Sequence, residues 1–284
     1  MGNTLLIGSC EPFSGKSALV LGLARHLLSE GRTVRFGKPL ATSLEWTAKG
    51  SPLPDPLIDD DVRFVGTTLG IDESRLIPSL HLLSPETADT RLRQGNLDAG
   101  TGLEMLLNDL QNDQDSFTML EAAGSLHEGL MYGLSLVQLA QGLDAPVILV
   151  HLWQDSRSVD ALLAAQHQLG DRLAGVVLNA VTPDEVEELN QHVVPALQAL
   201  GLKVFGVMPR SPLLRSVTVG ELVRRLDARV ICCKERLELL VETLSIGAMN
   251  VNSAMEFFRR RRNMAVVTGA DRTDIQLGAL EAST

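Results

Sequence analysis

The chain has 284 residues, of which 45% are hydrophobic and 21% charged, a composition typical of folded proteins and not of disordered ones. Its 35 acidic and 25 basic residues give a formal net charge of −10, which disfavours nucleic acids and anionic membranes as general partners. A small molecule or a protein is the expected partner. Aromatic residues make up only 4%, which favours an aliphatic core of buried parallel strands.

Short runs rich in Val, Ile and Leu alternate with amphipathic stretches, which predicts a doubly wound α/β domain with a mostly parallel sheet. The predicted strands are Thr4–Gly8, Thr33–Lys38, Phe117–Glu121, Pro146–Leu152, Leu173–Asn179 and Lys203–Pro209. The predicted helices are Lys16–Glu30, Gly100–Leu110, Arg157–Leu169 and Asp184–Leu200. Ligands of such sheets bind at the carboxyl ends of the strands.

Two segments interrupt this alternation, one at residues 42–56 and one that begins at about residue 216. Residues Thr42–Pro56 are rich in proline and predict a long irregular loop or lid. We expect a first domain over residues 1–215 and a second, smaller α/β module over residues 216–284. In that module we expect the strands Val230–Cys233 and Met264–Thr268 and the helices Val219–Leu226, Ser253–Arg262 and Asp274–Glu281. The arginines Arg259–Arg262 would finish a helix and complement its dipole, with an anion or partner patch as the alternative.

The lack of recognisable targeting signals, together with the cysteine spacing, predicts a reduced, cytoplasmic protein. No apolar run approaches the ~20 residues of a membrane span, and the N-terminus lacks the pattern of a signal peptide. The cysteines Cys10, Cys232 and Cys233 form no CxxC motif, and no two histidines have the spacing of a metal site. The spacing therefore predicts neither a disulfide framework nor a zinc site.

A phosphate-binding loop is the most specific motif. Gly15-Lys16-Ser17 follows the first predicted strand and opens the first predicted helix. Backbone N–H groups at such a helix start cradle phosphates, the lysine reaches the β/γ-phosphates, and the hydroxyl binds Mg²⁺. The preceding glycine is Gly8, so the loop is longer than the standard motif. The alternative is an ordinary glycine turn with a solvated lysine.

Further charged groups follow neighbouring strands. Lys38 ends the second strand, where it can stabilise charge on a transferred phosphoryl group, or can simply be a surface lysine before Pro39. Glu121 ends the third strand and is a candidate Mg²⁺ ligand, unless it reaches solvent. Asp60, within Asp59–Asp61, is a second candidate, with a helix N-cap cluster as the alternative.

These pieces together resemble dethiobiotin synthetase and the related N-terminal domain of long phosphate acetyltransferases. The matching motifs are Gly8…Gly15-Lys16-Ser17, Lys38-Pro39, Ser84-Pro85-Glu86, Glu121-x-x-Gly124, Pro146–Val150, Gly175–Asn179 and Gly206–Pro209. The resemblance covers about residues 1–215 and implies a P-loop NTPase fold that binds Mg-ATP.

The motifs and the resemblance together predict roles for individual residues. Lys16 and Lys38 would be the catalytic cations, and Ser17, Asp60 and Glu121 the metal ligands. Nucleotide contacts would come from Phe13, Ser14, Gly15, Lys16, Ser17, Ala18, Asn179 and Pro209. Asn179 would lie by the adenine, where an amide can pair with the base edge.

The segment Thr268–Gln276 is similar to the signature of the DRTGG domain, which accompanies these ATP-binding domains. Here Thr273 is followed by Asp274-Ile275 in place of two glycines. The chain ends soon after this signature and has no acetyltransferase domain, so we expect an incomplete module and no acetyl transfer.

Three functions remain open from the sequence. The first is an Mg-ATP-binding regulatory sensor, a homodimer with a protein partner at the DRTGG-like module. The second is an ATP-dependent ligase of the dethiobiotin synthetase type, which Glu86 disfavours because it replaces the usual histidine and repels a carboxylate substrate. The third is a non-catalytic scaffold on the same fold.

Overall fold

The computed structural model describes residues 3–44, 53–95, 97–98, 100–113, 115–212, 214 and 216–282. Residues 45–52, the middle of the predicted lid, lie outside this range. The chain divides into two compact units, residues 1–210 and 211–284, and each is described by itself. In the described part of the chain, no helix is both long and apolar enough to span a membrane.

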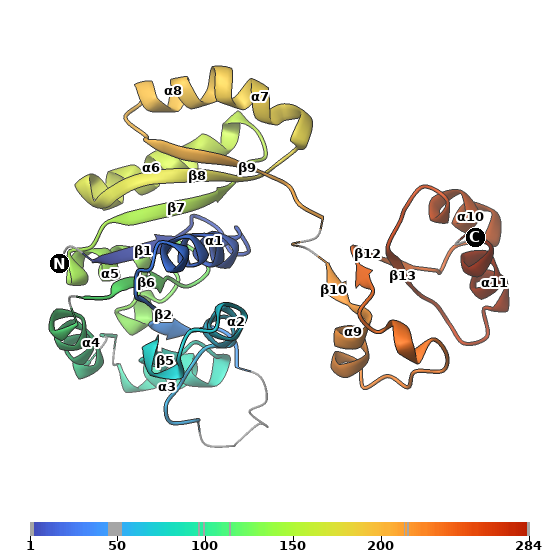
Figure 1. Ribbon diagram of the computed structural model, residues 1–284, viewed down its shortest axis with the longest axis horizontal. Coiled ribbons are helices and arrows are strands. Elements are labelled where there is room, and N and C mark those ends of the chain that lie inside the picture. Colours follow the sequence, from blue (N-terminus) through green and yellow to red (C-terminus); the bar gives the residue numbers. More distant parts are fainter. Residues whose placement is uncertain are drawn as a thin grey trace. The chain divides into compact units, whose positions relative to one another are not determined.

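The large unit is built on a seven-stranded sheet in the order β4-β2-β6-β1-β7-β8-β9 (Figure 1). The strands are Thr4–Gly8 (β1), Val34–Gly37 (β2), Leu76–Ile77 (β4), Phe117–Glu121 (β6), Val147–Leu152 (β7), Leu173–Val181 (β8) and Val204–Pro209 (β9). Every pairing is parallel. The predicted α/β fold with a mostly parallel sheet is confirmed, and each of the six predicted strands is present.

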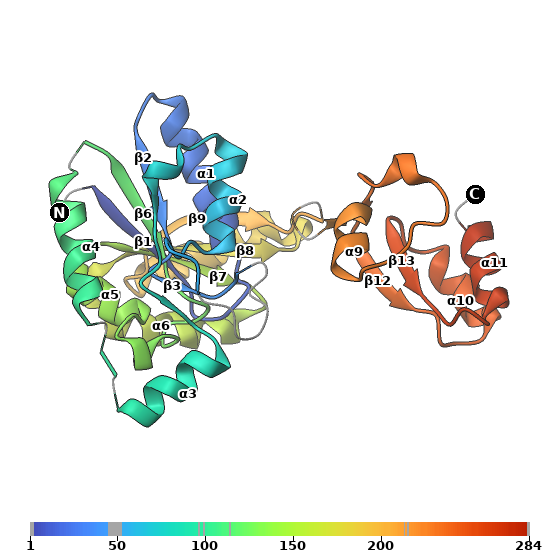
Figure 2. The same ribbon diagram turned by 90° about the horizontal axis from the view of Figure 1, so that it is seen from below.

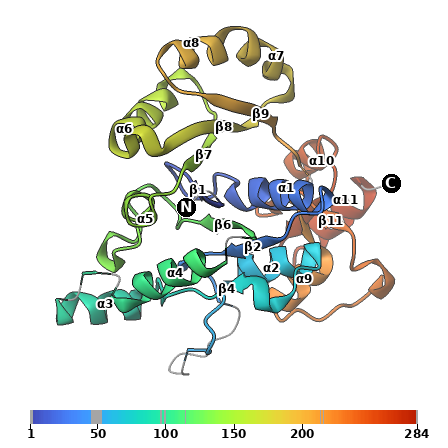
Figure 3. The same cartoon turned by 60° about the vertical axis from the view of Figure 1, so that its left-hand side comes forward.

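Helices cover both faces of this sheet (Figures 2 and 3). On one face, α1 (Lys16–Ser29) and α2 (Asp60–Leu69) bury Val20, Ala24 and Val62 against the strands. On the other face lie α4 (Thr101–Asn112), α5 (Leu136–Leu143) and α6 (Val159–Leu169). The core is almost wholly aliphatic, as the low aromatic content predicts.

The register of the central strands positions the site. Ile7 of β1 pairs with Glu121 of β6, and Gly8 pairs with Leu149 of β7. Because parallel strands end at the same edge, the loop after β1 lies between the ends of β6 and β7.

The helix expected over Asp184–Leu200 is divided. It consists of α7 (Val186–Glu188), a π-helical stretch over Leu189–Val193 and α8 (Val194–Ala199). Pro195 has no N–H to donate to the preceding turn, so regular α-helical bonding cannot continue through it. A short helix α3 (Pro85–Gln94) begins with a capping box between Ser84 and Thr87.

The small unit contains two short sheets and three helices among its described residues. β10 (Val217–Thr218) pairs antiparallel with β11 (Leu240–Val241), and β12 (Thr243–Ile246) pairs in parallel with β13 (Met264–Val267). The helices are α9 (Val219–Arg225), α10 (Val251–Phe258) and α11 (Thr273–Ala282). Ala254, Phe258 and Ile275 form its small core.

Two expectations for the small unit are wrong. The predicted strand Val230–Cys233 is an exposed loop, with Ile231 82% exposed and Cys233 in the left-handed region at φ 53°. This apolar run has no neighbouring strand to pair with among the described residues. The arginine run does not finish a helix, because α10 ends at Phe258 and the arginines form the turn that follows.

Candidate functional site

The phosphate-binding loop joins β1 to α1. Two of its residues occupy the left-handed region, Phe13 at φ 57° and Gly15 at φ 94°. No side chain caps the start of α1 in the described structure, so its first N–H groups are available to an anion. Phe13 is 96% exposed at the tip of the loop, whereas Ser14 is fully buried beneath it.

The loop borders a cavity of about 830 Å³ at the carboxyl edge of the sheet. This volume lies in the range of small-molecule binding sites. Lys16 and Lys38 both line it, although they come from different strand ends. The described lining residues are Pro12, Phe13, Ser14, Gly15, Lys16, Ser17, Lys38, Thr42, Ser43, Asp61, Leu83, Glu121, Ala122, Ala123, Gly124 and Glu128.

Lys16 is held at the base of this cavity. Its Nζ donates hydrogen bonds to Ser9 Oγ at 3.0 Å and to the Gly124 carbonyl oxygen at 3.3 Å. Burial lowers the pKa of Lys16, although the carboxylate of Glu121 acts in the opposite direction. A buried cation held by neutral oxygens is ready to exchange these partners for phosphate oxygens.

Glu121 and Ser17 form the part of the site that fits a magnesium ion. Ser17 Oγ donates to Glu121 Oε1 at 3.4 Å, and Glu121 Oε2 is buried without a hydrogen-bond partner among the described residues. Burial raises the pKa of Glu121 to about 7, against the pull of Lys38 and Lys16. A hydroxyl and an unpaired carboxylate oxygen are hard oxygen ligands, which Mg²⁺ prefers. Bound there, the ion would stabilise the ionised carboxylate and neutralise phosphate charge.

Lys38 is fixed by a ring of oxygen atoms. Its Nζ lies 2.6 Å from Thr42 Oγ1, 2.9 Å from Asp61 Oδ2 and 3.3 Å from Asp59 Oδ2. Burial opposes its charge, but the neighbouring carboxylates outweigh burial and raise the pKa of Lys38. The raised pKa favours the charged form of this lysine, which lines the same cavity as Lys16.

Asp59, and not Asp60, organises this side of the site. Asp59 is fully buried and accepts hydrogen bonds from the backbone N–H groups of Thr42 (2.7 Å), Ser43 (3.1 Å) and Asp61 (2.9 Å). It thereby caps α2 and binds Lys38 at the same time.

Replacing Asp59 by Ala is expected to lower the free energy of unfolding by about 2–4 kcal/mol, because it removes the cap of α2, the acceptor of three N–H groups and one of the two carboxylates that bind Lys38. Asp60→Ala is the matched control, since the half-buried Asp60 accepts only a hydrogen bond from Ser43 Oγ among the described contacts. It should cost no more than about 1 kcal/mol. Urea denaturation measures both values, and equal losses would contradict this assignment.

Asn179 contacts the phosphate-binding loop directly. Its amide nitrogen donates to the Ser14 carbonyl oxygen at 2.7 Å. A Cβ at Gly15 would lie only 2.1 Å from that nitrogen, so this close approach and the positive φ both require glycine. Asn179 therefore holds the loop in place, and an adenine contact from the same side chain stays a prediction.

The structure brings most of the predicted site residues to the cavity. Phe13 to Ser17, Lys38 and Glu121 line it, and Asn179 supports it from β8. Asp60, Ala18 and Pro209 are not among its described lining residues. The acidic residue that α2 directs to the cavity is Asp61, next in the chain to the predicted Asp60.

Comparison with known proteins identifies families and relatives that this chain matches. A family model described as an AAA domain matches residues 3–218, and a model of the DRTGG domain matches residues 221–284. A phosphate acetyltransferase from Nitratidesulfovibrio vulgaris is 25% identical over 294 aligned residues, covering 99% of this chain. This chain spans only 39% of the length of that relative.

Two further comparisons cover about three quarters of this chain. The ATP-dependent dethiobiotin synthetase BioD from Pseudomonas aeruginosa is 27% identical over 218 residues, covering 76% of this chain and 92% of that protein. Chloroplast FtsY from Physcomitrella patens is a solved structure with a TM-score of 0.43 and 14% identity, covering 73% of this chain and 58% of that one.

The resemblance drawn from the sequence motifs is thus confirmed at the level of the family. The AAA domain model covers well over half of the chain, and it contains every residue of the cavity described above. The chain belongs to the AAA domain family, as a P-loop ATPase-like domain related to dethiobiotin synthetase and the phosphate acetyltransferase N-terminus, followed by a DRTGG domain.

Proposed function

We propose that the large unit binds Mg-ATP in the cavity beside the phosphate-binding loop, and that the chain works as a regulatory ATP sensor. The observation that carries the proposal is the placement of two buried cations, Lys16 and Lys38, around one cavity that also holds Ser17 and the unpaired carboxylate oxygen of Glu121. Triphosphate and Mg²⁺ together match this arrangement of charges.

In the bound state each group has a distinct task. The N–H groups at the start of α1 would receive the β-phosphate, and Lys16 would leave Ser9 for the β/γ-phosphate oxygens. Lys38 would face the γ-phosphate from the opposite side. Ser17 and Glu121 would hold the ion, which supplies charge neutralisation between the phosphates.

The regulatory part of the proposal rests on the domain pairing. The ATPase-like unit is followed by a DRTGG domain, and the alignment with the phosphate acetyltransferase relative covers 99% of this chain. The DRTGG domain is the candidate surface for a protein partner. ATP binding would shift the population of conformations that this partner recognises.

A ligase of the dethiobiotin synthetase type is the second candidate. A smaller cavity of about 300 Å³ is lined by Glu86, Arg91, Tyr132 and hydrophobic residues of the large unit. Arg91 stacks over the Tyr132 ring at 4.7 Å and donates hydrogen bonds to the carbonyl oxygens of Met131 and Asp98. Its remaining N–H groups would receive a carboxylate, which favours a second substrate there. Glu86 in the same lining opposes such an anion, and for this reason we rank the sensor first.

Measurement of ADP release separates the two candidates. The sensor predicts one Mg-ATP bound per chain by calorimetry, and slow ADP release that a panel of amino acids and diamines with bicarbonate does not accelerate. Stimulation well above the background rate would establish the ligase instead. Absence of ATP binding would leave the scaffold as the function.

We further propose that the chain forms a homodimer through the small unit. Ile246 of β12 and Val267 of β13 are register partners and lie on one face of their sheet, where they are 69% and 49% exposed. Leu244, two residues before Ile246, extends this apolar face. Light scattering tests this, and a monomer at high concentration would contradict it.

A further inference from the structure

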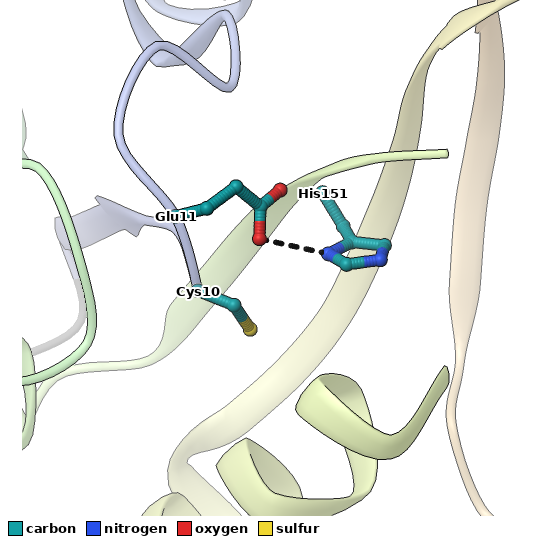
Figure 4. Close-up of side chains that lie close together, drawn as sticks. All are labelled: Cys10, Glu11 and His151. Carbon is teal, nitrogen blue, oxygen red and sulfur yellow. Dashed lines mark ion pairs between the residues drawn. The ribbon is translucent and has the colours of Figure 1, made fainter. Parts of the chain in front are cut away.

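Three side chains with different ligand chemistry meet on the side of the phosphate-binding loop next to β7. They are Cys10 and Glu11, which follow β1, and His151 near the end of β7 (Figure 4). The cysteine sulfur, a carboxylate oxygen and an imidazole nitrogen all lie within 4.8 Å of one another. None of these residues is among those that line the described nucleotide cavity.

Sheet topology brings this cluster together. β1 and β7 are parallel neighbours, so the residues after Gly8 lie beside the carboxyl end of β7. His151 is 140 positions away from Glu11 in the chain, which is why the spacing of cysteines and histidines predicts no such site.

His151 is the unsatisfied member of the cluster. Its side chain is only 3% exposed, and neither ring nitrogen makes a hydrogen bond to the described residues. Nδ1 does lie 3.2 Å from Glu11 Oε2, within ion-pairing distance, but this contact lacks hydrogen-bond geometry. A buried imidazole left in this state is costly unless a further group occupies the site.

The other two ligands are already oriented. Glu11 Oε1 accepts a hydrogen bond of 2.6 Å from the Leu152 N–H, which leaves Oε2 directed at His151. Cys10 is half-buried, and among the described residues its thiol donates one hydrogen bond, of 3.5 Å, to the Ala161 carbonyl oxygen. A backbone donor that holds a carboxylate in this way is typical of the outer shell of metal sites.

We propose that Cys10, Glu11 and His151 form a binding site for a zinc ion, separate from the nucleotide site. Sulfur, nitrogen and carboxylate ligands together favour Zn²⁺ over Mg²⁺ or Ca²⁺, which prefer oxygen alone. The bond lengths of tetrahedral zinc place neighbouring ligand atoms about 3.3–3.6 Å apart, and the three ligand atoms here already lie within 4.8 Å of one another. Three protein ligands leave the fourth position to water.

Zinc at this site would connect the phosphate-binding loop to β7. Cys10 and Glu11 belong to the loop, and His151 belongs to the central sheet. The proposal does not depend on ATP binding, because no residue of the nucleotide cavity takes part in it.

The test uses the full chain with Cys232→Ser and Cys233→Ser as the background, because these exposed thiols would also bind soft metals. In buffer free of nucleotide and Mg²⁺, this background protein should retain one zinc per chain through gel filtration. With Co²⁺ as the probe it should show the near-ultraviolet band of sulfur-to-cobalt charge transfer, and zinc should raise its Tm.

Adding Cys10→Ser to the background protein should remove the cobalt band. Either Cys10→Ser or His151→Gln should also weaken zinc binding at least about 10-fold, because mutation of groups that only hydrogen-bond to metal ligands already costs that much affinity. Circular dichroism and the metal-free Tm identify any variant that has failed to fold. If one variant fails, Glu11→Gln replaces it as a ligand variant. The proposal is overturned if the background protein retains no zinc, or if the folded Cys10→Ser variant keeps the cobalt band and the affinity.

Discussion

Replacing Lys16 by Ala is expected to weaken Mg-ATP binding by about 100-fold or more, equivalent to about 2–3 kcal/mol, because a charged hydrogen-bond donor to the phosphates is lost. Lys38, the other lysine of the cavity, is not free to replace it, because it is bound to Thr42, Asp59 and Asp61. Isothermal titration calorimetry of both proteins with Mg-ATP measures the difference.

The matched control for this experiment is Lys203→Ala. Lys203 is exposed and lies over the Phe205 ring at 4.9 Å, outside the described lining of the nucleotide cavity. The Lys203→Ala substitution removes the same type of side chain and the same charge, and it should leave the affinity for ATP unchanged. Equal affinity in wild type and the Lys16→Ala variant would refute the assignment of the loop.

Glu121→Gln is expected to have opposite effects on stability and on function. Burial raises the pKa of Glu121 to about 7, so without metal the folded protein holds a proton that the unfolded chain releases near the ordinary value of 4.5. The free energy of unfolding therefore falls as pH rises from 4.5 to 7, and the whole penalty is present above pH 7.

Glutamine cannot ionise, so at pH 8 without Mg²⁺ the variant should be more stable than wild type by up to about 3 kcal/mol. Its stability should also vary less between pH 4.5 and 7. In calorimetry, the same variant should lose the gain in ATP affinity that Mg²⁺ gives the wild type, because an amide is a weak ligand for this ion.

Glu104→Gln is the control, because Glu104 is an exposed residue of α4 and its change should alter neither property. A Glu121→Gln protein that is less stable than wild type at pH 8, or that keeps the full Mg²⁺ dependence, would show that Glu121 is a structural carboxylate and not a metal ligand.

The fold of the large unit could be predicted from the sequence because its strands are continuous aliphatic runs. A strand with both faces largely buried, such as Val147–Leu152, leaves a continuous aliphatic run that can be recognised in the sequence. The two-residue strand Leu76–Ile77 was missed because it is too short to show periodicity. Val230–Cys233 has the same composition as a strand but no partner, and partners cannot be read from composition.

The part of the candidate site that could be predicted from the sequence is the part formed by consecutive residues. Gly15, Lys16 and Ser17 are neighbours in the chain, so their spacing alone places them at a helix start. Within the run Asp59–Asp61, the structure directs Asp61 to the cavity and to Lys38, because one residue of helix rotation decides which carboxylate faces the lysine.

Contacts between distant segments were beyond the reach of the sequence. The hydrogen bond from Asn179 to the Ser14 carbonyl and the approach of His151 to Cys10 and Glu11 both depend on which strands are neighbours in the sheet. Strand order is a tertiary property that no local pattern encodes.

The central claim is that Mg-ATP occupies the loop between β1 and α1, and a crystal structure with a non-hydrolysable ATP analogue and Mn²⁺ tests it most directly. The account predicts the triphosphate on the backbone N–H groups of Gly15 to Ser17, with Lys16 turned from Ser9 to the phosphates and an anomalous manganese peak between Ser17 Oγ and Glu121. Nucleotide bound elsewhere, or an unchanged Lys16 with no density on the loop at saturating analogue, would contradict it.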